Sequence, residues 1–413
     1  MHLISGPLGT VAGLYEMVMD ALATRWAGGK AIRPKIIAST ATVRRADSQI
    51  RALFSRSCVS VFPPPGPDRR DSFFAKTLLA SESPARLYVG VAAQGRSLKV
   101  VLLRAVLTLL GTGQRAWETA GGSKPEFNSS DPYMTLLGNF NSLRELGGSR
   151  RIVEDEVRTR LAEYGRRQRV EPKDDLFASR QIGFDVLELT SRVSTNDVAA
   201  AKRRLALGFA DQERVDVALA TNMISVGLDI VRLGLMVVLG QSKASAEYIQ
   251  ATSRVGRDPL RPGLVVTLWN IHKPRDRSHY ERFTAYHASF YRSVEATSVT
   301  PFSPCALDRA LPATLVAMCR QECADLTPPR GAQDILAQRA GLDRLAQAIA
   351  ERAQNHKADL SDPERQALYA GVLHLCGDLL DDWLKIAKQA RDEGSAIQYQ
   401  EEVSAPLCSP SRA

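Results

Sequence analysis

The sequence has little of what secreted, fibrous or membrane-spanning chains need. Its six cysteines, scattered over 413 residues, are too few for a disulfide framework. No apolar run approaches the ~18 residues of a membrane-spanning helix. The first residues hold neither a basic leader nor the apolar stretch of a secretory signal. We therefore expect a cytoplasmic chain with reduced thiols and no membrane partner.

Only two of the cysteines lie close together. Cys319 and Cys323 are spaced i, i+4 on a predicted helix, so they offer fewer ligands than a structural zinc site requires. We expect no metal site, because buried structural thiols are the better interpretation of these residues.

A phosphate-binding loop of the form G-x-x-x-x-G-K-[ST] is also absent. The segment at residues 28–30 reads Gly-Gly-Lys but lacks the following Ser or Thr and a leading strand. The segment at residues 111–113 reads Gly-Thr-Gly and lacks the lysine. Nothing in the chain therefore predicts a complete cradle for nucleoside phosphates.

The composition that is present is that of an ordinary globular protein. Hydrophobic residues make up 44% and charged residues 24%, and at ~150 residues per domain the length suggests two or three domains. The net charge of +9 is uneven, because residues 331–413 carry 9 Lys/Arg against 13 Asp/Glu and residues 1–330 therefore carry +13. Such a basic region is typical of a protein that binds a phosphate backbone, although many basic proteins bind no nucleic acid.

Strands and helices alternate up to about residue 300. Near-continuous apolar strands between amphipathic helices indicate a parallel sheet covered on both faces, that is, a doubly wound α/β fold over residues 85–300. The predicted strands are 33–38, 59–62, 86–91, 134–137, 185–189, 215–220, 235–239 and 264–268, and the predicted helices are 14–26, 46–54, 98–110, 142–164 and 196–209.

A proline-rich segment, residues 63–67, interrupts this alternation. Consecutive prolines cannot donate ladder hydrogen bonds and favour a stiff, extended chain. We therefore place a linker at residues 63–84, with residues 1–62 before it as a separate region. An ordinary surface loop is the alternative interpretation.

Beyond residue 300 the strands stop, and residues 301–393 are predicted to form a helical region. Two apolar stripes at helical spacing indicate a core between these helices. The polar segment 394–413 is expected to be disordered. The first stripe is Leu342, Leu345 and Ile349, and the second is Leu368, Val372, Leu375, Leu379 and Trp383.

Two segments that come after predicted strands resemble motifs V and VI of the superfamily 2 helicases in order, spacing and placement. Residues 220–230 read Ala-Thr-Asn-Met-Ile-Ser-Val-Gly-Leu-Asp-Ile, and residues 250–257 read Gln-Ala-Thr-Ser-Arg-Val-Gly-Arg. Upstream, residues 39–42 look like motif III and residues 138–142 like motif IV. His2 and its successors resemble the segment that comes after the acidic pair of a DExH box. The resemblance covers nearly residues 1–300.

Within that superfamily, residues 140–147, 189–194 and 247–250 resemble the large helicase of the DISARM anti-phage system. The resemblance implies a RecA-like second helicase lobe at residues 85–300 and a role in antiviral defence. It also implies that residues 1–62 are the end of a truncated first lobe, and that residues 301–393 are a helical accessory region.

The resemblance further implies catalytic and nucleotide-binding roles. Arg257 is the candidate arginine finger, since a planar guanidinium suits charge on a γ-phosphate better than a lysine point charge does. Surface arginines at a solvated helix end are the alternative interpretation. The implied catalytic residues are Arg257, Arg254 and Gln250, and the implied nucleotide-binding residues are Gly227, Asp229 and Gly256.

Other matched residues are implied to hold nucleic acid or to join the two lobes. Thr221 and its adjacent amides would hold a phosphate. Ser142 and Arg144 would do so at the start of a helix, because a helix N-terminus favours anions. The implied interlobe residues are Thr40, Thr42 and His2.

An aromatic stretch near residue 285 has helical spacing, which invites a base-stacking interpretation. Core packing is the better one, because the same face would have to cover the edge of the sheet. The residues are Tyr280, Phe283, His287, Phe290 and Tyr291.

The missing ATPase parts limit the expected function. Besides the phosphate loop, the acidic pair that would hold Mg²⁺ should precede His2, and the sequence begins at Met1. We therefore expect the carboxyl-terminal part of a helicase that binds nucleic acid, with DNA favoured over RNA, and that hydrolyses no ATP alone. ATP and Mg²⁺ would bind only in a complete two-lobe enzyme, whose amino-terminal lobe a separate chain could supply. The alternative is a non-catalytic nucleic-acid-binding module or an inert truncated remnant.

Overall fold

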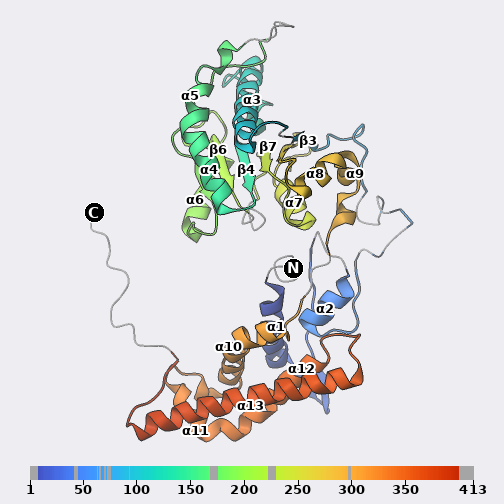
Figure 1. The fold of residues 1–413 in the computed structure, drawn as a ribbon, viewed down its shortest axis with the longest axis vertical. Coiled ribbons are helices and arrows are strands. Elements are labelled where there is room, and N and C mark those ends of the chain that lie inside the picture. Colours follow the sequence, from blue (N-terminus) through green and yellow to red (C-terminus); the bar gives the residue numbers. More distant parts are fainter. Residues whose placement is uncertain are drawn as a thin grey trace. The chain divides into compact units, whose positions relative to one another are not determined.

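The computed structural model describes residues 8–40, 45–62, 64, 67–68, 71, 76–92, 94–167, 175–221, 229–295 and 299–399. The chain forms two compact units, which Figure 1 shows as a mixed α/β body and a body of helices. We call residues 65–295 the sheet unit, and residues 1–64 with 296–413 the helical unit. The first boundary between the units therefore falls inside the proline-rich segment.

The sheet unit is built on six strands among its described residues. Their order is β3, β8, β7, β4, β6, β5, and every neighbouring pair is parallel. The predicted doubly wound parallel sheet is confirmed. The strands are β3 (Leu87–Ala92), β4 (Leu136–Phe140), β5 (Leu187–Leu189), β6 (Val217–Ala220), β7 (Leu235–Leu239) and β8 (Leu264–Trp269).

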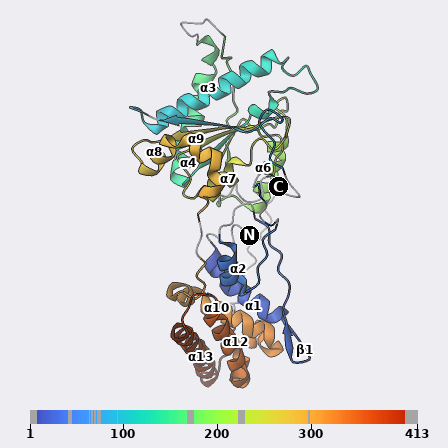
Figure 2. The same ribbon diagram turned by 90° about the vertical axis from the view of Figure 1, so that its right-hand side faces the viewer.

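Helices cover both faces of this sheet, as Figure 2 shows for α3 on one face and α7 and α9 on the other. Side chains alternate between the faces along each strand, so Leu136 and Phe140 pack with α3 whereas Leu137 belongs to the opposite core. The helices are α3 (Leu98–Thr119), α4 (Leu143–Arg151), the π-helical η2 (Ile152–Val157), α5 (Arg158–Leu161), α6 (Thr195–Ala206), α7 (Ser245–Thr252), α8 (Pro274–Glu281) and α9 (Phe283–Ser289).

Helix α3 continues nine residues past its predicted end at residue 110. Gly111, just past the predicted end, permits close packing. A Cβ on Gly111 would lie 2.8 Å from the Tyr164 ring. Trp117, in the last turns of α3, is buried against Phe209 at 5.0 Å between ring centroids. Tertiary packing therefore outweighs the low helix propensity of glycine here.

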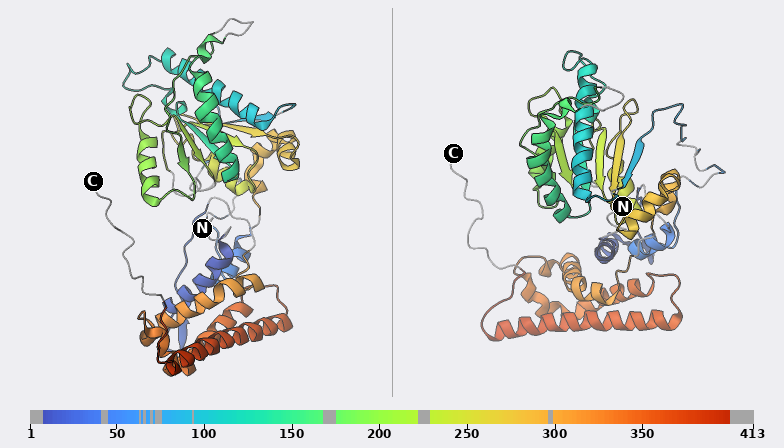
Figure 3. Two further views of the ribbon diagram at one scale, coloured as in Figure 1. Left: turned by 60° about the vertical axis from the view of Figure 1, so that its left-hand side comes forward. Right: turned by 45° about the horizontal axis from the view of Figure 1, so that its top comes forward.

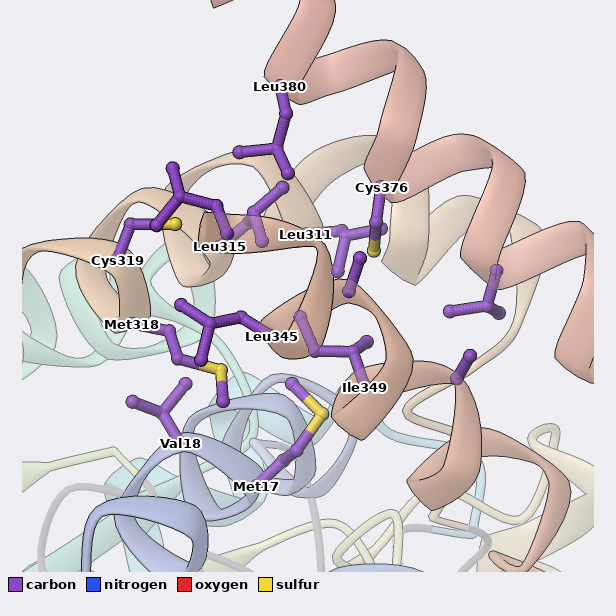
Figure 4. Packing of buried hydrophobic residues seen from close by; sticks show 14 of the residues in the cluster. Met17, Val18, Leu311, Leu315, Met318, Cys319, Leu345, Ile349, Cys376 and Leu380 are labelled. Atoms are coloured by element: carbon purple, nitrogen blue, oxygen red, sulfur yellow. The ribbon is translucent and has the colours of Figure 1, made fainter. Parts of the chain in front are cut away.

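The helical unit has a core to which α1, α10, α11, α12 and α13 contribute. Figure 4 shows Met17 and Val18 of α1 facing Met318, Leu345 and Ile349 of α10 and α12. Both predicted apolar stripes contribute to this core. The elements are α1 (Gly9–Ala23), β1 (Arg25–Ala27), β2 (Lys30–Ile32), α2 (Ala46–Phe54), α10 (Pro304–Glu322), α11 (Ile335–Gln338), α12 (Asp343–Gln354) and α13 (Asp362–Asp392).

Cys319 and Cys376 are buried thiols of this core. Burial raises the pKa of each to about 12, so neither ionises near neutral pH. Cys323 is half-buried. Within the described ranges, no cluster of three or more His, Cys, Asp or Glu side chains is arranged to hold a metal ion.

Helix α13 is a single unbroken helix of 31 residues (Figure 3). It packs along α12 and also contacts α10 and α11. Despite its length it is amphipathic, with buried Val372, Cys376 and Leu380 on one side. No helix of the described residues is both long enough and apolar enough to cross a membrane.

Two predicted strands of the amino-terminal region are wrong. Residues 33–38 and 59–62 have no regular secondary structure, and Ile37 is 88% exposed. A strand is stable only when a neighbour completes its ladder, and no neighbouring strand lies beside these residues in the described chain. Helix α2 matches the predicted range 46–54.

Residues 1–62 and 301–393, which the sequence separates, belong to one compact unit. That residues 1–62 are the end of a first helicase lobe stays a prediction. The beginning of the tail expected to be disordered is held by hydrogen bonds, since Tyr399 donates its hydroxyl to Leu326 O at 2.9 Å and its amide to Pro329 O at 3.1 Å. Residues 400–413 lie outside the described residues.

Candidate functional site

The parallel sheet separates the predicted site residues into two groups. Residues that come directly after a strand lie at the carboxyl edge of the sheet, and residues that lead into a strand lie at the amino edge. The carboxyl-edge group is Thr221, after β6, with Ser142 and Arg144, after β4; the amino-edge group is Asp229, Arg254, Gly256 and Arg257, in the segments leading into β7 and β8.

The two predicted motifs meet at the amino edge through an ion pair. Arg257 Nη1 donates to Asp229 Oδ1, 28 residues away. The Asp229 side chain is 69% exposed and the Arg257 side chain 30% exposed, so both charges remain within reach of a ligand. Since an exposed ion pair contributes only ~0–1 kcal/mol, a phosphate could replace Asp229 at little cost.

Gly256 is required by the backbone beside Arg257. Its φ is +67°, and a Cβ there would lie 2.1 Å from Gly263 N and 2.5 Å from Gly263 Cα. The Gly256 amide also donates to Leu233 O at 2.8 Å. Because backbone atoms of Gly263, the residue before β8, occupy that space, no residue with a side chain fits at this turn. Gly256 therefore fixes where the main chain delivers Arg257.

Arg254 and Gln250 lie on the chain that leads to this turn. Gln250 is half-buried on α7, and Arg254 lies just past the end of that helix, with its amide donating to Ala251 O at 3.1 Å. Burial lowers the pKa of the Arg254 guanidinium, which is still charged at neutral pH because arginine starts so high. Arg254 is thus a second cation, three residues before Arg257 in the sequence and less exposed than it.

A buried polar network holds α7 in place, and sequence reasoning missed it. The Tyr248 hydroxyl lies 3.0 Å from both Thr267 Oγ1 and His287 Nε2, and Tyr248 is fully buried. His287 Nδ1 lies 2.9 Å from Phe283 O, which can only accept, so Nδ1 carries the proton and Nε2 accepts from Tyr248. Burial lowers the pKa of His287, which favours this neutral form.

The aromatic stretch is half-buried at Phe283 and His287 and 36% exposed at Tyr280, so the expected core packing is only partly confirmed. Phe283 packs edge-on against Trp269, with ring centroids 5.5 Å apart. Tyr280 makes a similar contact with Trp269 at 5.8 Å. Tyr291 differs, since it is 59% exposed, and the side chain of Phe290 lies outside the described residues.

At the carboxyl edge, Ser142 begins α4. Its Oγ accepts from the Glu145 amide at 3.2 Å, so the hydroxyl serves as a helix cap and its availability for a ligand is reduced. Arg144 is exposed in the first turn of α4, and the first amides of a helix point out of its N-terminus, where anions are favoured. Thr221 is half-buried, and its amide donates to Leu189 O at 3.4 Å.

Of the remaining predicted site residues, the structure describes Thr40. Thr40 is half-buried in the helical unit, in a segment without regular structure. His2, Thr42 and Gly227 lie outside the described residues. The interlobe roles of Thr40, Thr42 and His2 stay predictions.

A family model matches part of the sheet unit. Residues 158–259 match the family model described as the helicase conserved C-terminal domain. The matched range contains Thr221 of the carboxyl-edge group and all four residues of the amino-edge group. The sheet beside these residues is parallel and doubly wound. Residues 158–259 of the sheet unit thus match a helicase conserved C-terminal domain, the doubly wound parallel sheet is consistent with a RecA-like lobe, and the chain resembles the carboxyl-terminal portion of a superfamily 2 helicase.

A relative extends the likeness beyond that domain. The chain is 44% identical to the DISARM protein DrmA of Bacillus paralicheniformis over 335 residues, which is 81% of this chain and 29% of the relative. The resemblance to a DISARM helicase is therefore confirmed over most of the chain. This chain spans less than a third of the length of that relative.

Solved helicase structures resemble the chain more distantly. The DUF1998 helicase MrfA bound to DNA is 13% identical, with a TM-score of 0.43, and the likeness covers 76% of this chain and 34% of that one. The Mycobacterium smegmatis helicase Lhr bound to single-stranded DNA and AMP-PNP is 14% identical, with a TM-score of 0.38, over 86% of this chain and 50% of that one.

Proposed function

We propose that the chain works as the carboxyl-terminal part of an ATP-dependent superfamily 2 helicase in cytoplasmic anti-phage defence. The observation that carries the proposal is the meeting of the two motifs at Asp229 and Arg257, inside the matched domain. In this proposal Arg257 serves a motor whose phosphate-binding loop and acidic pair belong to an amino-terminal lobe. The defence role rests on the identity with a DISARM protein.

The amino-edge group has the chemistry to meet the phosphates of ATP. Arg257 offers a planar set of donors, its partner Asp229 is exposed, and Gly256 fixes the turn. ATP, when bound with Mg²⁺, supplies phosphate oxygens that accept from Arg257 and Arg254. Gly227 and Asp229 would complete the nucleotide-binding group, and Gln250, on α7, would help to orient the nucleotide.

The carboxyl edge would hold the nucleic acid, with DNA favoured over RNA. The sheet unit carries 34 Lys/Arg against 26 Asp/Glu, whereas the helical unit carries 20 against 19. The excess positive charge of the chain is therefore concentrated on the unit that has the motifs. Ser142 and Arg144 at the start of α4, with Thr221, would contact backbone phosphates.

The chain alone would hydrolyse no ATP, because its sequence has no G-x-x-x-x-G-K-[ST] segment. A separate chain would then supply the amino-terminal lobe, with Thr40, Thr42 and His2 near the junction. The same missing loop favours a second candidate function, a non-catalytic nucleic-acid-binding module. Restored hydrolysis in a two-chain mixture separates these two functions.

The test mixes this chain with a separately produced amino-terminal lobe that carries the phosphate loop and acidic pair, and measures phosphate release with ATP, Mg²⁺ and single-stranded DNA. We expect no turnover from the chain alone, turnover from the mixture, and a loss of at least about tenfold in the Arg257→Lys mixture. Removal of an arginine finger costs ~10³–10⁵ in rate, and lysine retains the charge but not the planar contact.

The matched control is Arg277→Lys, the same change at an arginine whose side chain is 66% exposed and paired with Glu281. It should leave hydrolysis unchanged. If Arg257→Lys behaves like this control, Arg257 is a surface arginine. If the chain alone hydrolyses ATP and Arg257→Ala abolishes that turnover, the division of the motor between two lobes is wrong.

A further inference from the structure

We propose that a basic pocket at the carboxyl edge of the sheet binds a backbone phosphate of a single-stranded nucleic acid among Lys243, Lys273 and Arg275. None of these three residues belongs to the matched motifs. The inference rests on the proposed function, since it assumes that the sheet unit binds nucleic acid. The pocket has a volume of about 390 Å³, within the range of ~300–1,000 Å³ that is usual for small-molecule sites.

Three loops that come after neighbouring strands form the pocket, residues 141–145 after β4, 240–243 after β7 and 273–276 after β8. Buried Asp276 ties two of them together, because it accepts from the Gln241 amide at 3.1 Å and from the Asn270 amide at 2.9 Å. Asn141 Nδ2 ties in the third, since it donates to Leu239 O and Gln241 O, both at 3.2 Å. The walls are therefore fixed by hydrogen bonds before any ligand arrives.

Gly240 is the residue that lets these loops approach each other. Its φ is +74°, and a Cβ there would lie 3.4 Å from an Asp276 carboxylate oxygen and 3.5 Å from Asn141 Nδ2. These are ordinary van der Waals distances, so a side chain would have room but would be strained by the positive φ of the backbone. The pocket thus depends on a glycine at the end of β7.

The charge of the pocket favours an anion. Lys243 and Arg275 are exposed and make no ion pair within the described part of the chain, and Lys273 Nζ is 3.4 Å from Glu145 Oε1. The carboxylate of Asp276 is already used by two amides. Helices α4 and α8 both begin at this pocket, and their N-termini add partial positive charge.

The experiment uses the full chain and a fluorescein-labelled 20-nucleotide single-stranded DNA, with an RNA of the same sequence as a second probe, and measures anisotropy at several salt concentrations. The variant is Lys243→Gln/Lys273→Gln/Arg275→Gln. The matched control is Arg96→Gln/Lys99→Gln/Arg104→Gln, which removes the same charge from exposed residues of and before α3. Circular dichroism establishes that both triple variants fold.

We expect the pocket variant to bind at least about tenfold more weakly and to lose about 1 from the slope of log K against log salt, since one phosphate contact releases about one counterion. The control should change affinity less than threefold and keep the slope. Wild-type chain that binds neither probe overturns the proposed nucleic-acid function. Wild-type binding with equal effects of the two triple variants overturns the pocket alone.

Discussion

Replacement of Asp20 by asparagine should loosen the whole helical unit. Asp20 lies on α1, is 6% exposed, and accepts hydrogen bonds from three arginines that are distant in the sequence. Arg33 Nε donates at 2.9 Å, Arg56 Nη2 at 2.7 Å and Arg352 Nη1 at 3.1 Å. One carboxylate therefore balances three guanidinium groups.

The same arginines also hold the end of α2. Arg352 Nη2 donates to Leu53 O at 2.6 Å, Arg56 Nη1 to Phe54 O at 2.9 Å and Arg33 Nη1 to Ser55 O at 3.1 Å. These carbonyls close a helix and have no partner within it. Asp20 thus links α1, the end of α2 and α12 through a single charge.

The size of the effect is set by the charge that the substitution leaves behind. The Arg352 side chain is 6% exposed, and burial has already lowered its pKa to about 10. Breaking a buried ion pair by removing one partner costs ~3–5 kcal/mol, because the other charge is left uncompensated. At ~1.4 kcal/mol per factor of ten, protection against opening should fall by about 10²–10⁴-fold.

Hydrogen exchange followed by mass spectrometry measures this protection separately in each unit. In Asp20→Asn, peptides from α1, α2 and α12 should exchange faster by that factor, and peptides from α3 in the sheet unit should not change. The control is Asp343→Asn, whose 61%-exposed carboxylate pairs with Arg339 and should matter by less than ~1 kcal/mol. Unchanged exchange in α1 and α12 would refute the account of Asp20 as the link.

Two further predictions concern a backbone position and acid. Gly256→Ala should lower the sheet unit's free energy of unfolding, measured with urea, by ~1–3 kcal/mol or more. Gly147→Ala, where a Cβ would meet open space, should be neutral or stabilising. Equal effects of the two substitutions would contradict the requirement for glycine at residue 256. Burial raises the pKa of Asp20, but bonds from Arg56 and Arg33 lower it further, so its net pKa lies below the ordinary value. The stability that Asp20 contributes is therefore complete above the unfolded pKa of ~3.9 and is lost as the pH falls from there through the lower pKa of the folded state. Acid unfolding of the helical unit, followed by hydrogen exchange, should therefore depend less on pH in Asp20→Asn.

The sequence alone determined the α/β sheet and its motifs. Runs such as Val217–Ala220 and Leu235–Leu239 are apolar without alternation, which is typical of strands buried on both faces. The segments around Asp229 and Arg257 could be recognised because each carries its residue types in a short, fixed order. Ser142 could be assigned to a helix start for the same reason, since capping is a local property of a few residues.

Tertiary structure decided what depends on partners far along the chain. The segment 33–38 is apolar enough for a strand, but no neighbouring strand completes it in the described chain, and its Arg33 turns to Asp20 instead. No pattern in the sequence links Asp20 to Arg352, which are 332 residues apart, or brings Lys243, Lys273 and Arg275 to one pocket. Gly240 and Gly256 are visible as glycines, yet only the folded backbone shows their positive φ. Local order fixes periodicity and caps, whereas the pairing of remote charges is set by how the packed elements meet.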